Sequence, residues 1–144
     1  MRKLLRGSSG SAMVEFAIAM PFLVLLLIGV IELGRYMYFA IVAQHASEAG
    51  AQYGAQSLAN AANNTQIEAA VAADAPNVSV TASPQAICLS SGQSVNCPVG
   101  TPSPGVTEYV QVKVTGTFKS LLNYPGIPNN VPITATTTMR VLSQ

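Results

Sequence analysis

Charged residues are scarce in this chain of 144 residues: only 9% are Asp, Glu, Lys or Arg, whereas 49% are hydrophobic. Charged residues usually make up about a quarter of a soluble domain, so the composition excludes an ordinary soluble protein. Seven basic and six acidic residues give a formal net charge of +1. This balance provides no basic surface that would attract nucleic acid, and we exclude nucleic acid as a partner.

Histidine and cysteine are also rare, with one His and two Cys. His45 has no Cys, Asp or second His at the spacing of metal ligands, and no Ser-His-acid set can be assembled around it. The sequence also has no phosphate-binding loop. We therefore expect no enzyme, no metal and no cofactor, and we interpret His45 as a solvated or loosely packed side chain.

One apolar run dominates the N-terminal part of the chain. Phe16 to Ile31 carries no charge, and a few residues at each end extend it to the roughly 20 that cross about 30 Å of hydrocarbon. Glu32 and Arg35 would then lie at the far membrane boundary, where Arg35 can extend its charged head into the headgroup region. We assign the transmembrane helix to residues 11–35.

The charges before this run indicate its orientation. Arg2, Lys3 and Arg6 mark the N-terminus as cytoplasmic, so a single span places residues 36–144 in the periplasm, outside the bacterial inner membrane. Pro21 lies inside the span and predicts a local kink. A removable secretory signal peptide is the alternative, but the nearest small-x-small triplet begins only at Ala49.

Glu15 is a carboxylate at the start of the apolar run, where a charge is costly. It is the fifth residue after Gly10, and cleavage after Gly10 would make Ser11 a free α-amino terminus. Ser11 and Glu15 are then neighbours on one helix face. The amine could pair with the carboxylate, within one chain or across to an adjacent subunit, and offset its desolvation. The alternative is an uncleaved signal anchor with Glu15 in the cytoplasmic headgroup layer.

The stretch "GSAMVEF" resembles the processing site of type IVb pilins and pseudopilins of the Flp/Tad (tight adherence) system, with Gly10, Glu15 and Phe16 at the matching positions. The longer run "SAMVEFAIAMPFLVLLLIGVIELGR" is similar to the TadE-like minor pseudopilins in particular. Glu32, Gly34 and Arg35 match the "E-x-G-R" that closes the family's span, and the ending "TATTTMRV" also looks like the family.

This resemblance implies a substrate of a prepilin peptidase, with residues 1–10 as the leader and cleavage between Gly10 and Ser11. Loss of the three basic leader residues would change the formal charge from +1 to −2. The other implied partners are Tad pilins and pseudopilins and the inner membrane. Phe16 stands where major Flp pilins usually have Tyr, which fits a minor pseudopilin better.

The helical pattern continues beyond the membrane, and we count Val14 to Leu58 as one helix. Its periplasmic part carries one stripe of small residues with a coiled-coil-like period, namely Ala40, Ala43, Ser47, Gly50 and Gly54. A second, bulkier stripe consists of Phe39, Val42, Ala46, Ala49 and Tyr53. We expect the bulkier stripe to cover the globular part and the small one to pack beside copies or homologues. The alternative is that the small stripe packs on the protein's own sheet.

Beyond this helix the pattern changes twice. Thr65 with Glu68 forms a capping box for a short helix that Pro76 ends. After Pro76 the period becomes two, with Thr and Val dominant. We expect three or four antiparallel strands covered by the long helix. The fold class is therefore α+β: a long N-terminal transmembrane and periplasmic helix packed on a small C-terminal sheet, which the resemblance describes as pilin-like.

Cys88 and Cys97 flank the turn sequence "LSSGQSVN". In an oxidising periplasm, an even pair this close indicates a disulfide that staples a hairpin. Closing such a short loop contributes about 2 to 3 kcal/mol in the chain-entropy account. Free thiols are the alternative.

Two functions fit these features. The resemblance implies a minor pseudopilin, a membrane-anchored structural component needed for assembly of Flp/Tad adhesive pili, in which Glu15 sets the register. The alternative is an uncleaved bitopic protein that serves the envelope or secretion through a periplasmic interaction domain.

Overall fold

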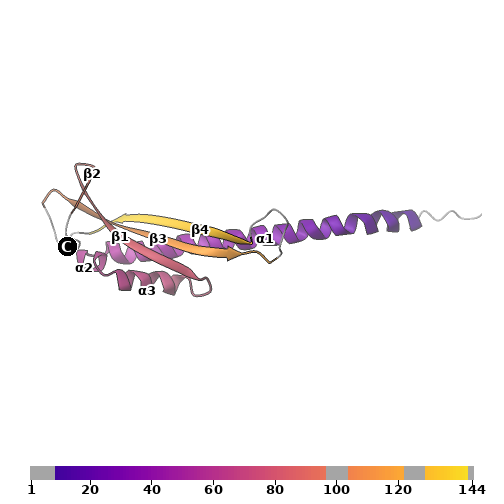
Figure 1. The fold of residues 1–144 in the computed structure, drawn as a ribbon, viewed down its shortest axis with the longest axis horizontal. Coiled ribbons are helices and arrows are strands. Elements are labelled where there is room, and N and C mark those ends of the chain that lie inside the picture. The colour runs from indigo at the N-terminus through magenta and orange to yellow at the C-terminus, as the bar shows by residue number, and fades with distance from the viewer. Residues whose placement is uncertain (1–8, 97–103, 122–128, 143–144) are drawn as a thin grey trace, which may run out of the picture. The chain divides into compact units, whose positions relative to one another are not determined.

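The structure is a computed structural model that describes residues 9–96, 104–121 and 129–142 (Figure 1). Its helices are α1 (Ser9–Ala55), α2 (Leu58–Ala61) and α3 (Asn64–Asp74). Its strands are β1 (Val80–Ser90), β2 (Gln93–Val95), β3 (Thr107–Lys119) and β4 (Asn130–Arg140). The chain divides into two compact units, Met1–Arg35 and Tyr36–Gln144, so α1 contributes to both.

Helix α1 is longer at its N-terminal end than the sequence predicts, and it continues past Pro21 without a break. It ends at Ala55 rather than at Leu58. The side chain of Ser57 explains this early end, because its Oγ accepts a hydrogen bond from the backbone N–H of Asn60 at 3.1 Å. Ser57 is therefore the N-cap of α2, in extended backbone geometry that α1 cannot include.

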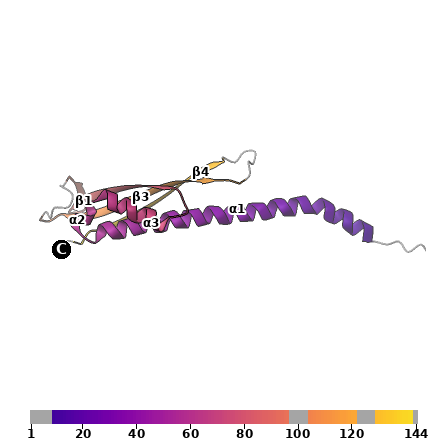
Figure 2. The ribbon, with the colours of Figure 1, turned by 90° about the horizontal axis from the view of Figure 1, so that it is seen from below.

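The strands form one antiparallel sheet in the order β2-β1-β3-β4. The predicted alternation along β3 is confirmed: Val110, Val112 and Val114 are each 0% exposed and share one face. Ile133 and Ala135 of β4 are buried on the same face. Because the second half of α1 packs on this face (Figures 1 and 2), the expected α+β fold is confirmed.

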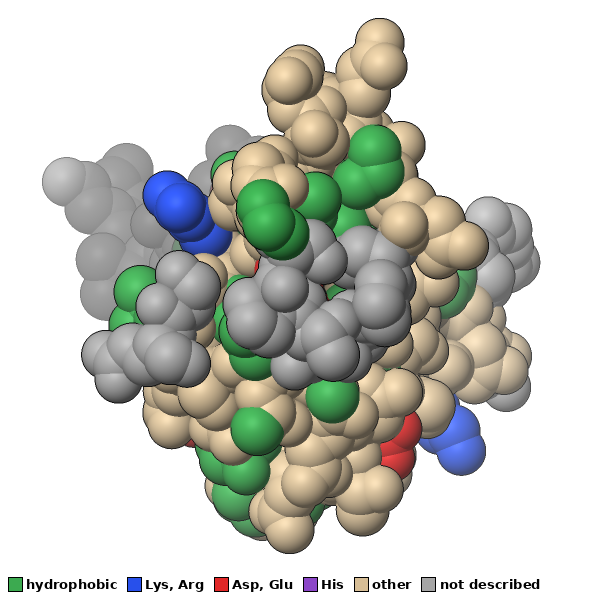
Figure 3. All heavy atoms as spheres, turned by 90° about the vertical axis from the view of Figure 1, so that its left-hand side faces the viewer, with side chains coloured by type: hydrophobic (Ala, Val, Ile, Leu, Met, Phe, Trp, Pro, Cys, Tyr) green, Lys and Arg blue, Asp and Glu red, His purple; other side chains and the backbone are tan. Residues whose placement is uncertain are grey.

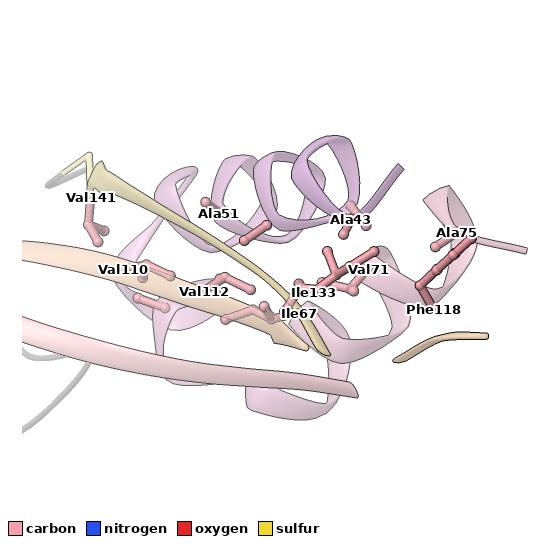
Figure 4. Packing of buried hydrophobic residues seen from close by; sticks show 14 residues of the cluster. Ala43, Ala51, Ile67, Val71, Ala75, Val110, Val112, Phe118, Ile133 and Val141 are labelled. Carbon is pink, nitrogen blue, oxygen red and sulfur yellow. The ribbon is translucent and has the colours of Figure 1, made fainter. Parts of the chain in front are cut away.

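The small-residue stripe of α1 packs on the sheet and on α3, and Figure 4 labels one of its residues, Ala43, among the buried core residues. A Cβ placed on Gly50 would lie 2.6 Å from Val71 Cγ2, and one on Gly54 would lie 2.9 Å from Val110 Cγ1. Of the bulkier stripe, only Ala46 is fully buried. Both stripes therefore contact the core. Phe39, Val42 and Tyr53 of the bulkier stripe pack against it half-buried, as expected, and the small stripe packs on the protein's own sheet, which is the alternative stated above. The closest approach is made by the small stripe, because only small side chains let the helix backbone come this near to the valines.

The end of this core nearest to residue 36 is aromatic. The ring of Phe118 on β3 meets the rings of Tyr36 and Phe39 edge to face, at centroid distances of 5.6 and 5.4 Å. Such pairs contribute about 0.5–1.5 kcal/mol beyond the area that they bury. The three rings therefore anchor the first turn of the second unit to the sheet.

Helix α3 begins at a different cap from the one predicted. The side-chain oxygen of Asn63 accepts a hydrogen bond from the backbone N–H of Gln66 at 3.2 Å, so Asn63 is the N-cap and Thr65 lies inside the helix. The capping box of Thr65 and Glu68 is therefore wrong. Asn caps a helix at least as well as Thr, and this earlier cap adds two residues, Asn64 and Thr65, to the start of the helix.

One polar contact crosses the otherwise apolar interface between α1 and β4. Ser47 is 0% exposed, and its Oγ donates to the backbone carbonyl of Gln44 at 2.8 Å. It also lies 2.7 Å from Thr137 Oγ1, which in turn accepts from Gln44 Nε2 at 3.4 Å. These three bonds are mutually consistent if Thr137 donates to Ser47, so the contact sets the register of the helix on the strand.

Replacing Thr137 with valine should lower the free energy of unfolding of the second unit by about 1 kcal/mol, because Ser47 loses its donor across the interface. The matched control is Thr138→Val on the same strand. Thr138 faces solvent and accepts only from Gln111 at 3.2 Å among the described residues, so its loss should change the free energy by at most about 0.5 kcal/mol. Denaturant unfolding measures both, and equal effects would contradict the proposed register contact.

Candidate functional site at the start of α1

Gly10 and Ser11 lie in the first turn of α1, and both are exposed. A Cβ placed on Gly10 would meet no atom within 4 Å. The fold therefore gives no reason for glycine at this position, in contrast to Gly50 in the same helix. Residues 1–8 of the expected leader lie outside the described residues.

Glu15 lies one turn after Ser11, and the Ser11 hydroxyl donates a hydrogen bond to Glu15 Oε1 at 3.3 Å. The i and i+4 spacing that the sequence predicts therefore places the two side chains in contact on one helix face. Phe16 follows and is exposed. The first turns of the helix thus present an acid and an aromatic ring outward, next to the residue that cleavage would turn into an amine.

The part of α1 that follows is apolar on all sides. By length and composition the helix is able to cross a membrane, and none of its most apolar stretch is buried inside the protein. Its large exposed side chains up to residue 33 are Met13, Val14, Phe16, Ile18, Met20, Phe22, Leu23, Val24, Leu25, Leu26, Leu27, Val30, Ile31 and Leu33. A helix that is apolar all round fits a membrane span, and the first unit therefore fits a single-pass membrane protein.

The two charges at the expected far boundary form an ion pair. Arg35 Nη1 lies 3.0 Å from Glu32 Oε2, and the side chains are 34% and 16% exposed, respectively. The sequence places both residues at the boundary, but their pairing is not among its predictions. Their signs and spacing in the sequence indicate the pairing, because opposite charges three residues apart meet on a helix. Pairing lowers the cost of placing either charge near hydrocarbon.

The structure describes only one of the two cysteines. Cys88 lies on β1 opposite Val95 of β2 and is 5% exposed. The expected hairpin is present, and its turn consists of Ser91 and Gly92 with φ of 52° and 81°, respectively. Two central residues with positive φ are typical of tight hairpins. Cys97 lies outside the described residues, so its disulfide with Cys88 stays a prediction.

The remaining candidate side chain, His45, lies on the exposed side of α1. Its Nδ1 is 3.8 Å from Glu48 Oε2, and the imidazole is 65% exposed. In the part of the chain that the structure describes, no group of three or more His, Cys, Asp and Glu side chains could hold a metal ion. The exposed imidazole agrees with the solvated side chain that the sequence predicts.

A comparison with protein-family models supports the resemblance. The family described as "TadE-like protein" matches residues 10–52, a segment that contains Gly10, Ser11, Glu15, Phe16 and the Glu32–Arg35 pair. Comparisons with curated proteins and with solved structures found no match. The match covers the apolar part of α1 and the small-residue stripe as far as Gly50, and Gly54 and the sheet lie outside it. Residues 10–52 of this chain are therefore TadE-like, as the motifs of the sequence predict.

Proposed function

We propose that the protein is a minor pseudopilin, anchored in the bacterial inner membrane and required for assembly of Flp/Tad pili. In this proposal residues 1–10 are a cytoplasmic leader, residues 11–35 cross the membrane, and residues 36–144 form a periplasmic domain. A prepilin peptidase cleaves between Gly10 and Ser11. The mature chain then associates with other Tad pilins and pseudopilins.

The observation that carries this proposal is the contact between Ser11 and Glu15. Their side chains already lie 3.3 Å apart, one turn from a glycine that packing does not require. Cleavage would put a positive amine on Ser11, on the same helix face as the carboxylate. An opposite charge on the same helix face stabilises the ionised acid in a medium that otherwise disfavours it.

The second candidate is an uncleaved bitopic protein with an unrelated periplasmic role. The ion pair of Glu32 and Arg35 fits this candidate equally well, since any membrane anchor can place such a pair at its boundary. The two candidates differ in the N-terminus of the mature chain, which one experiment can determine.

Substitution of Gly10 by a bulkier residue separates them. We expect intact-mass measurement of membrane-extracted wild-type protein to show loss of residues 1–10, and Gly10→Val to retain them almost completely. The substitution is harmless to the fold, because a Cβ on Gly10 meets no atom within 4 Å.

The matched control is Gly29→Val, at a second glycine of α1 where a Cβ meets no atom within 4 Å. This variant should be processed like the wild type. A wild-type chain that keeps its first ten residues in cells with an active prepilin peptidase would contradict cleavage at Gly10 and favour the uncleaved anchor.

A further inference from the structure

In the second unit, the basic residues lie on the sheet and the exposed acidic residues lie on the helices that pack against it. The three basic residues, Lys113, Lys119 and Arg140, are all exposed on β3 and β4. Lys113 pairs across the sheet with Thr136, Lys119 with Asn130, and Arg140 with Tyr109. Because the buried Val110, Val112 and Val114 occupy the alternate positions of β3, all three cations point to the face away from the helices.

The acids lie on the other side. Glu48 is on α1, and Glu68 and Asp74 are exposed on α3. Both helices pack on the inner face of the sheet, where Val71 of α3 approaches Gly50 of α1. The fourth acid, Glu108, is buried on the inner face of β3. The outer sheet face therefore carries three exposed positive charges. The helix layer carries two exposed negative charges, Glu68 and Asp74, and the half-buried Glu48, which accepts from Gln44 at 2.9 Å.

Among the described residues, the outer sheet face carries no other charge and is mostly polar; its apolar side chains are the exposed Pro132 and the half-buried Ile87 and Leu89. Its exposed polar residues besides the cations are mostly threonines, namely Thr81, Ser83, Gln85, Thr117, Asn130, Thr134, Thr136 and Thr138. Charged side chains are also sparse on the end of the molecule seen in Figure 3. Few other charges are present to oppose this separation. The positive sheet face of one molecule therefore attracts the negative helix layer of a neighbouring molecule.

We propose that copies of this chain associate with the outer sheet face of one copy against the helix layer of the next. The occupant is a second copy because the unit itself carries both a positive surface and a negative one. The two surfaces of the contact differ, so the contact is heterologous. A heterologous contact leaves one surface free at each end and continues into an open array unless the rotation closes a ring.

This inference rests on the proposed membrane anchoring in one respect only. Exposed ion pairs are individually weak, so the contact needs the high local concentration that a shared membrane provides. Since the test below contains no other pilus protein and no peptidase, its outcome is separate from the outcome of the Gly10 experiment.

The test is zero-length carbodiimide cross-linking of the full chain in phosphatidylcholine vesicles, with isotope-labelled and unlabelled chains mixed. We expect mixed-isotope links from Lys113 and Lys119 to carboxylates of Glu48, Glu68 or Asp74. High salt should reduce their yield about three- to tenfold, since 1 M salt shortens the screening length to about 3 Å. Links confined to single chains, or links that high salt leaves unchanged, would overturn the proposal.

Charge reversal provides the matched variants. Lys113→Glu should reduce the links of Lys119 between chains about three- to tenfold, whereas Lys113→Arg, which keeps the charge, should leave them unchanged. A mixture of Lys113→Glu chains with Glu68→Lys chains should restore association through a link between positions 113 and 68. If both Lys113 variants behave alike, or the mixture yields no such link, the contact is not the one proposed.

Discussion

Replacing Gly50 with valine should lower the free energy of unfolding of the second unit by about 3 kcal/mol or more. A Cβ at this position would lie 2.6 Å from Val71 Cγ2 and 3.3 Å from Val112 Cγ1. Val71 is 1% exposed and Val112 is 0% exposed, so neither side chain has solvent to move into. Valine adds two further methyl groups, and α3 must therefore move away from α1. Overpacking of this kind typically costs 1–3 kcal/mol, occasionally more.

Calorimetry of the full chain in detergent measures this effect as a fall in melting temperature of about 10 °C or more. The control is Gly34→Val in the same helix, where a Cβ meets no atom within 4 Å. It should leave the transition of the second unit within about 2 °C of the wild type. Equal melting temperatures for Gly50→Val and the wild type would show that α1 does not pack on α3 and β3 as described.

The strands were predictable because alternate side chains of a strand point to opposite faces of the sheet, so a hydrophobic period of two identifies the buried face. Alternation in "TEYVQVKVTGTF" places Val110, Val112 and Val114 on one face, and these are the most completely buried valines of β3. The pattern of this one strand is enough to predict which of its side chains are buried. No knowledge of the partner surface is needed.

The closest approach of α1 to the sheet was not predictable in the same way. Both stripes have helical spacing, and the bulkier one is the more hydrophobic, which favours it by composition alone. The valines of β3 and α3 already fill the interface, so the best helix surface is the one that adds least volume. Gly50 and Gly54 satisfy this condition. Such complementarity belongs to a pair of surfaces and cannot be determined from one segment.

The candidate site was predictable in part. The spacing of Ser11 and Glu15 correctly predicted their contact in the helix, because this contact depends only on helix geometry. The pairing of Glu32 with Arg35 depends on the same geometry and could have been found from their signs and spacing. The contact of Ser47 with Thr137 spans 90 residues, and no local pattern indicates a partner that distant.

Replacing Glu15 with alanine should leave membrane insertion intact and reduce incorporation into pili about tenfold or more. Insertion is preserved because alanine is less costly than glutamate at a membrane boundary. Incorporation falls because the proposed amine of Ser11 loses the carboxylate that compensates it. A difference of about 1.4 kcal/mol already changes an assembly equilibrium tenfold. The measurement compares the protein in sheared filaments with the protein left in the membrane fraction.

The variant Glu15→Gln tests whether assembly depends on the charge of Glu15 or on its hydrogen bond. Glu15→Gln keeps the length of the side chain and an oxygen that can accept from Ser11, as Glu15 Oε1 does at 3.3 Å, but it removes the negative charge. If the pairing is electrostatic, this variant should assemble as poorly as Glu15→Ala, since an uncompensated amine is costly near hydrocarbon whether or not it has a neutral acceptor. Normal assembly of the glutamine variant would show that Glu15 acts through its shape and hydrogen bond, and the requirement for a liberated amine would then lose its support.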